Sequence, residues 1–203
     1  MTQIEMTGVT SVLPAGMRER IMQEATLLFT RSGYNAVSMR EIAAACSITK
    51  AGLYYYFKNK EALIIAIMTD YLGEIGRLID DCRAASSNAH GRLTAFIRAV
   101  FAQPAEKRAI IRLASQEMSN LSSQARSSFN QLYQDEFIAP LGEILTEGMQ
   151  SGELRPANSH QLVWVLLGMM YPFFYPGQER QGLEEVLDLI ISIFFDGIAR
   201  HAE

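Results

Sequence analysis

The sequence predicts an all-α protein, with an N-terminal helix-turn-helix domain of three helices, a C-terminal helical bundle and about nine helices in total. Apolar residues recur three and four positions apart along nearly all of the 203 residues, which is the spacing of amphipathic helices. The alternation typical of strands is nearly absent. With 49% hydrophobic and 20% charged residues, the chain has enough apolar material for a core and is not of disordered composition.

Four helices are predicted in the first part of the chain, because each begins at a good capping residue or ends at a breaker. Gly33 ends the first helix, and Ser38 with Glu41 forms a Ser-x-x-Glu capping box at the start of the second. Thr49 and Asn59 are placed to cap the third and the fourth. The predicted helices are residues 17–32, 39–46, 50–56 and 60–82.

Five further helices are predicted after a polar loop at 83–88. Pro104 fits the first turn of one of them. Pro140 should kink another near Glu136, because proline has no N–H to donate to that residue's carbonyl. Residues 151–156 form a turn. The predicted helices start near Leu93 and at Pro104, and then span 124–149, 159–171 and 183–201.

The formal net charge of −4 is unevenly distributed. Residues 1–60 hold seven Lys or Arg and four Asp or Glu, a net charge of +3, whereas the rest hold eleven and eighteen, a net charge of −7. A basic first segment on an acidic body is compatible with a nucleic-acid partner for the first segment.

Other function classes find little support. The histidines at 90, 160 and 201 lie far apart, and no nucleophile, phosphate-loop or dinucleotide motif is present, so we expect no enzyme, catalytic residue, metal or cofactor. Two cysteines make no disulfide framework, and the first residues do not form a signal peptide. The longest apolar stretch has 14 residues, fewer than the roughly 20 of a membrane span. We expect a cytoplasmic protein that does not enter a membrane.

Residues 38–60 have the size and rhythm of a helix-turn-helix motif. In its second helix Leu53 and Phe57 take the core side, so at least one of the three consecutive tyrosines at 54–56 must point outward. Exposed tyrosines beside Lys50 and a small Ala-Gly pair suit a surface that lies against phosphates and base edges.

Lys60 begins the next helix. A helix N-terminus with a lysine can bind phosphate, and the alternative is a solvated side chain.

Residues 21–66 resemble the DNA-binding domain of the tetracycline-repressor (TetR) family. The resemblance covers seven elements in their usual order and spacing, at residues 21–25, 28–29, 33–34, 38–43, 48–54, 56–57 and 58–63. One departure is Ser47, where the family's turn commonly has glycine, and this departure bears on the stability of the turn.

The resemblance implies a homodimer that binds a pseudo-palindromic operator in double-stranded DNA, with residues 1–59 as the DNA-binding domain and 60–203 as the ligand-binding and dimerisation domain. The phosphate-contact residues that it implies are Ser38, Thr49, Tyr54, Tyr56 and Lys60. The base-reading residues that it implies are Lys50, Ala51 and Gly52, with Arg40 and Tyr55 as additions. Lys50 can donate to guanine O6 and N7. A helical scaffold that has lost DNA binding is a weaker alternative, since these residues are intact.

In the resembled family the last two helices pair with those of a second subunit, which fits the strongly apolar residues 159–171 and 183–201; a purely internal core is the alternative.

The other helices would surround a cavity for a small effector that releases a repressor from its operator, although activation is also open. Lacking acidic or histidine clusters, the chain favours an apolar or neutral effector. Candidate lining residues, each of which could instead be ordinary core, are Phe96, Phe101, Met118, Phe129, Met149, Trp164, Tyr171 and Phe174.

Overall fold

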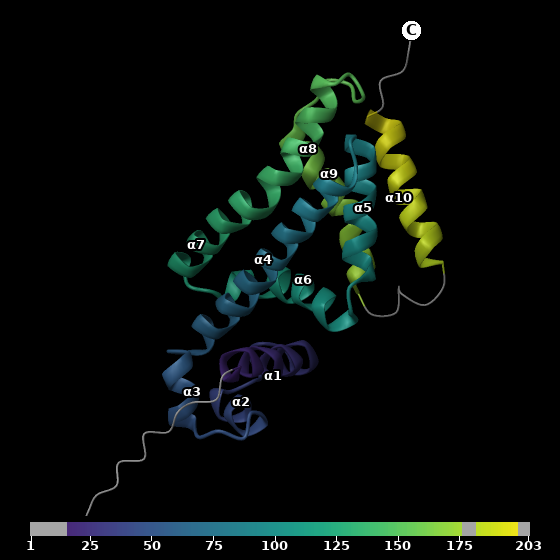
Figure 1. Cartoon of the computed structure of the whole chain (residues 1–203). Helices are drawn as coiled ribbons and strands as arrows, with labels where there is room; N and C mark the ends of the chain where they lie inside the picture. The colour runs from purple at the N-terminus through teal and green to yellow at the C-terminus, as the bar shows by residue number, and fades with distance from the viewer. Residues whose placement is uncertain (1–15, 176–181, 199–203) are drawn as a thin grey trace, which may run out of the picture.

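A computed structural model of the chain describes residues 16–175 and 182–198 (Figure 1), and within these residues it contains helices and no strand. The predicted all-α class is therefore confirmed. The α-helices in chain order are α1 Met17–Ser32, α2 Met39–Ala45, α3 Lys50–Tyr56, α4 Lys60–Ala85, α5 Ala89–Ala102, α6 Ala105–Glu117, α7 Ser123–Tyr133, α8 Ala139–Gln150, α9 Ser159–Met170 and α10 Leu183–Ile198. Short 3₁₀ turns follow α6 at Met118–Asn120 and α9 at Tyr171–Phe174.

Helices α1 to α3 form a small unit, here called the head, at one end of α4, and the remaining helices form the body around the rest of α4 (Figure 1). The predicted caps hold this arrangement locally. Ser38 Oγ accepts from the backbone N–H of Glu41 at 3.3 Å, and the Glu41 carboxylate accepts from the Ser38 N–H at 2.7 Å. Thr49 and Asn59 cap α3 and α4 by accepting from backbone N–H groups at 3.0 and 2.7 Å. These bonds satisfy N–H groups that the helices themselves leave without acceptors.

The turn between α2 and α3 contains a strained residue. Ser47 has φ 56°, the left-handed region that glycine adopts at little cost. Serine therefore does reach the backbone geometry that this turn needs, but its Cβ makes that conformation less favourable.

Helix α4 extends beyond its predicted end. It continues through Arg83 to Ala85, so the predicted loop at 83–88 is reduced to residues 86–88. The guanidinium of Arg83 pairs with Glu143 at 2.8 Å and Glu147 at 2.5 Å, both on α8. These partners lie about sixty positions away in the sequence, where local spacing gives no sign of them.

The predicted kink at Pro140 takes the form of a π-helical turn at Gln134–Ile138, centred on Glu136. It divides the predicted 124–149 helix into α7 and α8, which accounts for a tenth α-helix among the described residues. The Glu136 carbonyl faces α4 and lies 3.5 Å from where a Cβ on Gly76 would be. Helix α4 therefore passes close to the irregular turn, at a separation where a Cβ would make ordinary van der Waals contact.

Residues 1–15 and the predicted end of the last helix at 199–201 lie outside the described residues. In the part of the chain that is described, no helix has the length and apolarity needed to cross a membrane.

Replacing Ser47 by glycine should raise the free energy of unfolding by up to about 1 kcal/mol, because glycine removes the Cβ clash of the left-handed conformation at some cost in unfolded-chain entropy. Urea denaturation of the two proteins measures the difference. Ser47→Val is the matched control and should destabilise by about 1 kcal/mol or more, since a β-branched residue is worse there. A glycine variant less stable than the parent would contradict this account.

Candidate nucleic-acid interface and internal cavity

Helix α3 presents an exposed face with mixed polar and aromatic side chains. Leu53 and Phe57 are buried, as predicted, and hold the helix on the head. Tyr55 is 75% exposed and Tyr54 43% exposed, so two of the three tyrosines face outward. The ammonium of Lys50 lies 5.7 Å from the centre of the Tyr54 ring.

The sequence-predicted interface residues other than Lys60 differ in exposure and in the bonds that their side chains already make. Arg40, Thr49, Lys50, Ala51, Tyr54 and Tyr55 are exposed on α2, α3 or the residue before α3. Gly52 and Tyr56 are partly covered. Ser38 and Thr49 already use their side-chain oxygens as caps, and the Ser38 hydroxyl donates to Glu41 at 2.7 Å. The structure thus brings these residues to neighbouring helix ends and faces of the head.

Lys60 is engaged within the protein. Its ammonium donates to the backbone carbonyls of Tyr34 at 2.7 Å and Val37 at 2.8 Å, with a third carbonyl, that of Asn35, at 3.4 Å. The same group lies 4.3 Å from the centre of the Tyr34 ring. Because an ammonium has three N–H donors, these contacts occupy it without a phosphate. Lys60 fixes the start of α4 to the loop between α1 and α2.

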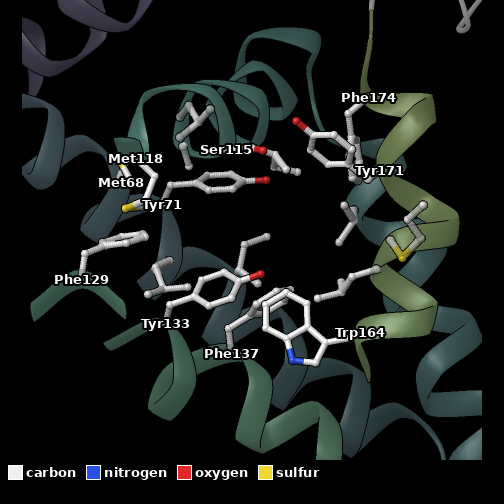
Figure 2. A pocket seen from close by; sticks show the side chains of 18 of the residues that line it. Met68, Tyr71, Ser115, Met118, Phe129, Tyr133, Phe137, Trp164, Tyr171 and Phe174 are labelled. Atoms are coloured by element: carbon white, nitrogen blue, oxygen red, sulfur yellow. The ribbon is translucent and has the colours of Figure 1, made fainter. Parts of the chain in front are cut away.

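The body contains a cavity of about 750 Å³, partly open to solvent, between α4, α5, α6, α7 and α9 (Figure 2). Of the eight residues predicted to line it, six do so: Phe96, Met118, Phe129, Trp164, Tyr171 and Phe174. The other two predictions are wrong. Phe101 stands behind the wall, where it stacks on Phe174 with ring centres 4.8 Å apart, and Met149 packs against the core from α8.

Sequence reasoning missed a large part of the cavity wall. Helix α4 contributes Met68, Tyr71, Leu72 and Ile75, whose spacing is that of any buried helix face. Polar groups were missed as well, among them Ser115, Asn130 and Gln134. A signal for Tyr133 was available, because it lies four residues after Phe129 and therefore on the same face of α7.

The cavity wall is uncharged. Among the described residues, none of the side chains that line it belongs to Asp, Glu, Lys, Arg or His. Burial raises the pKa of Tyr133 to about 12 and also raises the pKa of Tyr71. Both phenols therefore remain protonated at neutral pH. Figure 2 shows both hydroxyls directed into the space.

A direct link joins the start of α4 to the start of α7. The Glu61 carboxylate accepts from the Ser122 backbone N–H at 2.9 Å and from its hydroxyl at 2.7 Å. These hydrogen bonds hold the pKa of Glu61 below its usual range. Ser122 is the N-cap of α7, and α7 carries Phe129 and Tyr133 into the cavity wall.

The outer surface of α9 and α10 exposes large apolar side chains. Val165, Leu189 and Ile193 are 54%, 57% and 54% exposed, and Trp164 is 45% exposed. Gly197 on α10 has open space where a Cβ would lie. An apolar surface on two adjacent helices is typical of a helix-helix interface between subunits.

Two family models match this chain in sequence order. Residues 21–67 match bacterial regulatory proteins of the tetR family, and residues 86–174 match the tetracyclin repressor-like C-terminal domain. The chain belongs to the tetR family of bacterial regulatory proteins. Members of this family regulate transcription, and the head is the family's DNA-binding helix-turn-helix.

Individual proteins agree with the family assignment. The chain is 26% identical over 151 residues to the transcriptional repressor KstR2 of Mycolicibacterium smegmatis, which covers 74% of each protein. A tetR-family protein from Rhodococcus RHA1 superposes with a TM-score of 0.79 at 19% identity, over 93% of this chain and all of that one. AibR in complex with isovaleryl coenzyme A and operator DNA superposes with a TM-score of 0.75 at 26% identity, over 88% and 98%.

Replacing Lys60 by alanine should lower the free energy of unfolding by about 1–3 kcal/mol, since hydrogen bonds from a charged group to buried or half-buried carbonyls are lost. Urea denaturation measures it. The matched control is Lys58→Ala, two residues earlier and exposed, which should change stability by less than about 0.5 kcal/mol. If Lys60→Ala were fully stable yet lowered the salt dependence of DNA binding, the ammonium would instead be a phosphate contact.

Proposed function

We propose that the protein is a homodimeric, cytoplasmic repressor that binds a pseudo-palindromic operator through α3 and leaves it when a small, predominantly apolar molecule fills the body cavity. The observation that carries this proposal is the position of α4. Its first turn is anchored to the head through Lys60, and its middle part, from Met68 to Ile75, forms a wall of the cavity. A molecule in the cavity therefore contacts the same helix that positions the head.

On the DNA side, we assign base reading to Lys50, with Ala51 and Gly52 letting α3 approach the floor of the major groove. Arg40 and Tyr55 extend this surface. The hydroxyls of Thr49, Tyr54 and Tyr56 are proposed to contact phosphates and to fix the register of the helix. Ser38 would join them only by giving up the hydrogen bond that its hydroxyl donates to Glu41. Two heads in one dimer would read two half-sites.

For the dimer, we propose that the exposed apolar strip of Val165, Leu189 and Ile193 packs against the same strip of a second copy. Pairing through the outer face of α9 and α10 leaves the head at the far end of α4 free for DNA (Figure 1). A symmetric dimer has two such heads.

On the effector side, an uncharged cavity favours a neutral molecule, because burying a charge without a partner is costly. AibR, at 26% identity, binds isovaleryl coenzyme A. The acyl part of such a thioester is uncharged and therefore suits an uncharged cavity. The charged nucleotide would then remain outside, where a surface groove on α7 shares Asn130 and Gln134 with the cavity and includes Arg126. We propose no catalytic activity: the relatives are transcriptional regulators.

The route from cavity to head is proposed to run through Glu61 and Ser122. Movement of α7 around a bound molecule displaces Ser122, which is hydrogen-bonded to the first turn of α4. Lys60, the preceding residue, transfers that displacement to the loop before α2. The separation of the two α3 helices in a dimer then changes, and with it the fit to the operator.

Replacing Lys50 by alanine should change the preferred base pair at one position of each half-site, with a loss of discrimination of about 1–3 kcal/mol. Mobility shifts on duplexes from around the protein's own gene, and on single-base variants of the bound one, measure it. Arg155→Ala is the control, because this exposed arginine lies in the turn between α8 and α9. Unchanged base preference would show that Lys50 does not read the bases, and salt-independent binding would count against phosphate contacts altogether.

Replacing Glu61 by alanine should weaken the coupling between effector and DNA. With a compound that releases the parent protein from DNA, we expect the ratio of DNA dissociation constants with and without compound to fall by about two- to thirty-fold. Affinity of the compound for the DNA-free protein should change much less. Asp70→Ala is the control, an exposed acid on the same helix. Full release of the Glu61→Ala variant at the parent's compound concentration would contradict the proposed route.

A further inference from the structure

Tyr133 brings to the cavity a hydroxyl donor that the protein does not use. Tyr133 lies on the last turn of α7, and its hydroxyl points into the open space (Figure 2). Within the described part of the chain, this hydroxyl has no hydrogen-bond partner, although its ring packs against Phe129, Phe137 and Trp164 with centre distances of 5.2 to 6.3 Å. The ring is thus fixed while the donor remains available.

The other cavity phenols differ in this respect. The Tyr71 hydroxyl donates to the side-chain oxygen of Gln103 at 3.0 Å. The Tyr171 hydroxyl is 3.0 Å from the Tyr175 hydroxyl. Both are therefore paired inside the protein, and Tyr133 differs from them because its O–H has no acceptor among the described residues.

The absence of charged side chains from the described cavity wall narrows the class of ligand further. No acid or base lines the cavity among the described residues, so a carboxylate or ammonium placed there would have no counter-ion. A phenol that remains protonated can donate to an uncharged oxygen. Most of the other lining side chains are aromatic or aliphatic and pack against apolar groups. A hydrocarbon that covers this donor would leave it without an acceptor, so a ligand with an acceptor at this position gains over a pure hydrocarbon.

We infer that Tyr133 determines effector specificity by donating a hydrogen bond to an uncharged oxygen acceptor, such as the carbonyl of a ketone, ester, thioester or lactone, and that the cavity discriminates against free carboxylates. This inference rests on the proposed function, because it assumes that the cavity binds the effector. It adds to the proposed function the chemical class of the part of the effector that lies inside the cavity.

The test uses three probes with one carbon skeleton: valerophenone, which has a ketone, pentylbenzene, which has no oxygen, and 5-phenylvalerate, which is ionised at pH 7.5. Their affinities for the full chain are measured by displacement of the uncharged dye N-phenyl-1-naphthylamine. Tyr133→Phe keeps the ring and its packing and removes only the donor. Tyr71→Phe is the matched control, since its hydroxyl already donates to Gln103.

We expect Tyr133→Phe to weaken valerophenone binding by roughly three- to ten-fold, the net effect of one hydrogen bond, and to leave pentylbenzene within about two-fold. Tyr71→Phe should leave the ratio of the two affinities unchanged. The parent protein should bind 5-phenylvalerate at least about ten-fold more weakly than valerophenone, because the carboxylate loses its hydration.

Three results would overturn the inference: equal loss for ketone and hydrocarbon, which would mean that the ring packing matters and not the donor; no loss for the ketone; or tighter binding of the carboxylate than of the ketone. If neither the dye nor any probe bound the parent protein, the proposed effector cavity itself would be wrong. That outcome is distinct, because in the first three cases the cavity does bind apolar molecules.

Discussion

Two adjacent side chains in the first turn of α4 make contacts in opposite directions, and the relation between head and body depends on them. Lys60 donates to the carbonyls of Tyr34 and Val37 in the head, and Glu61 accepts from Ser122 at the start of α7 in the body. The helix that follows has 26 residues and is about 39 Å long. A rigid rod of this length converts a small tilt at its cavity end into a displacement of the head. The helix would not transmit this displacement if its first turn lacked the contact of Lys60 with the head or that of Glu61 with the body.

The parts of this arrangement that local chemistry determines were predictable. The caps at Ser38, Thr49 and Asn59 follow from the donors that every helix start leaves open, and the irregular turn at Glu136 follows from the missing N–H of Pro140. The exposure of Tyr54 and Tyr55 follows from helical geometry once Leu53 and Phe57 are inside. Each of these predictions needed residues at most a few positions apart.

What could not be predicted depends on residues far apart in the chain. The end of α4 depends on the pairing of Arg83 with α8, and the role of Lys60 depends on a loop 23 to 26 residues away. The cavity presents the same difficulty, because a side chain facing a cavity has the same spacing as one facing packed core. Phe101 was therefore placed in the wall, although it supports the wall from behind, and Tyr71 was overlooked, although it faces the space.

The cavity also explains why the coupling can run in both directions. A cavity wall of methionines and aromatic rings adapts more readily than a solid core, and a ligand packs against it best in the arrangement of α4 and α7 that fits it. Met68 and Tyr71 lie on α4, the helix that carries Glu61, and Phe129 and Tyr133 lie on α7, the helix that Ser122 caps. A molecule that contacts both α4 and α7 stabilises one separation of these two helices. By linkage, DNA that selects a different separation weakens the binding of that molecule by the same factor by which the molecule weakens DNA binding. The free energy available for release from DNA is therefore limited by the difference in ligand affinity between the two arrangements.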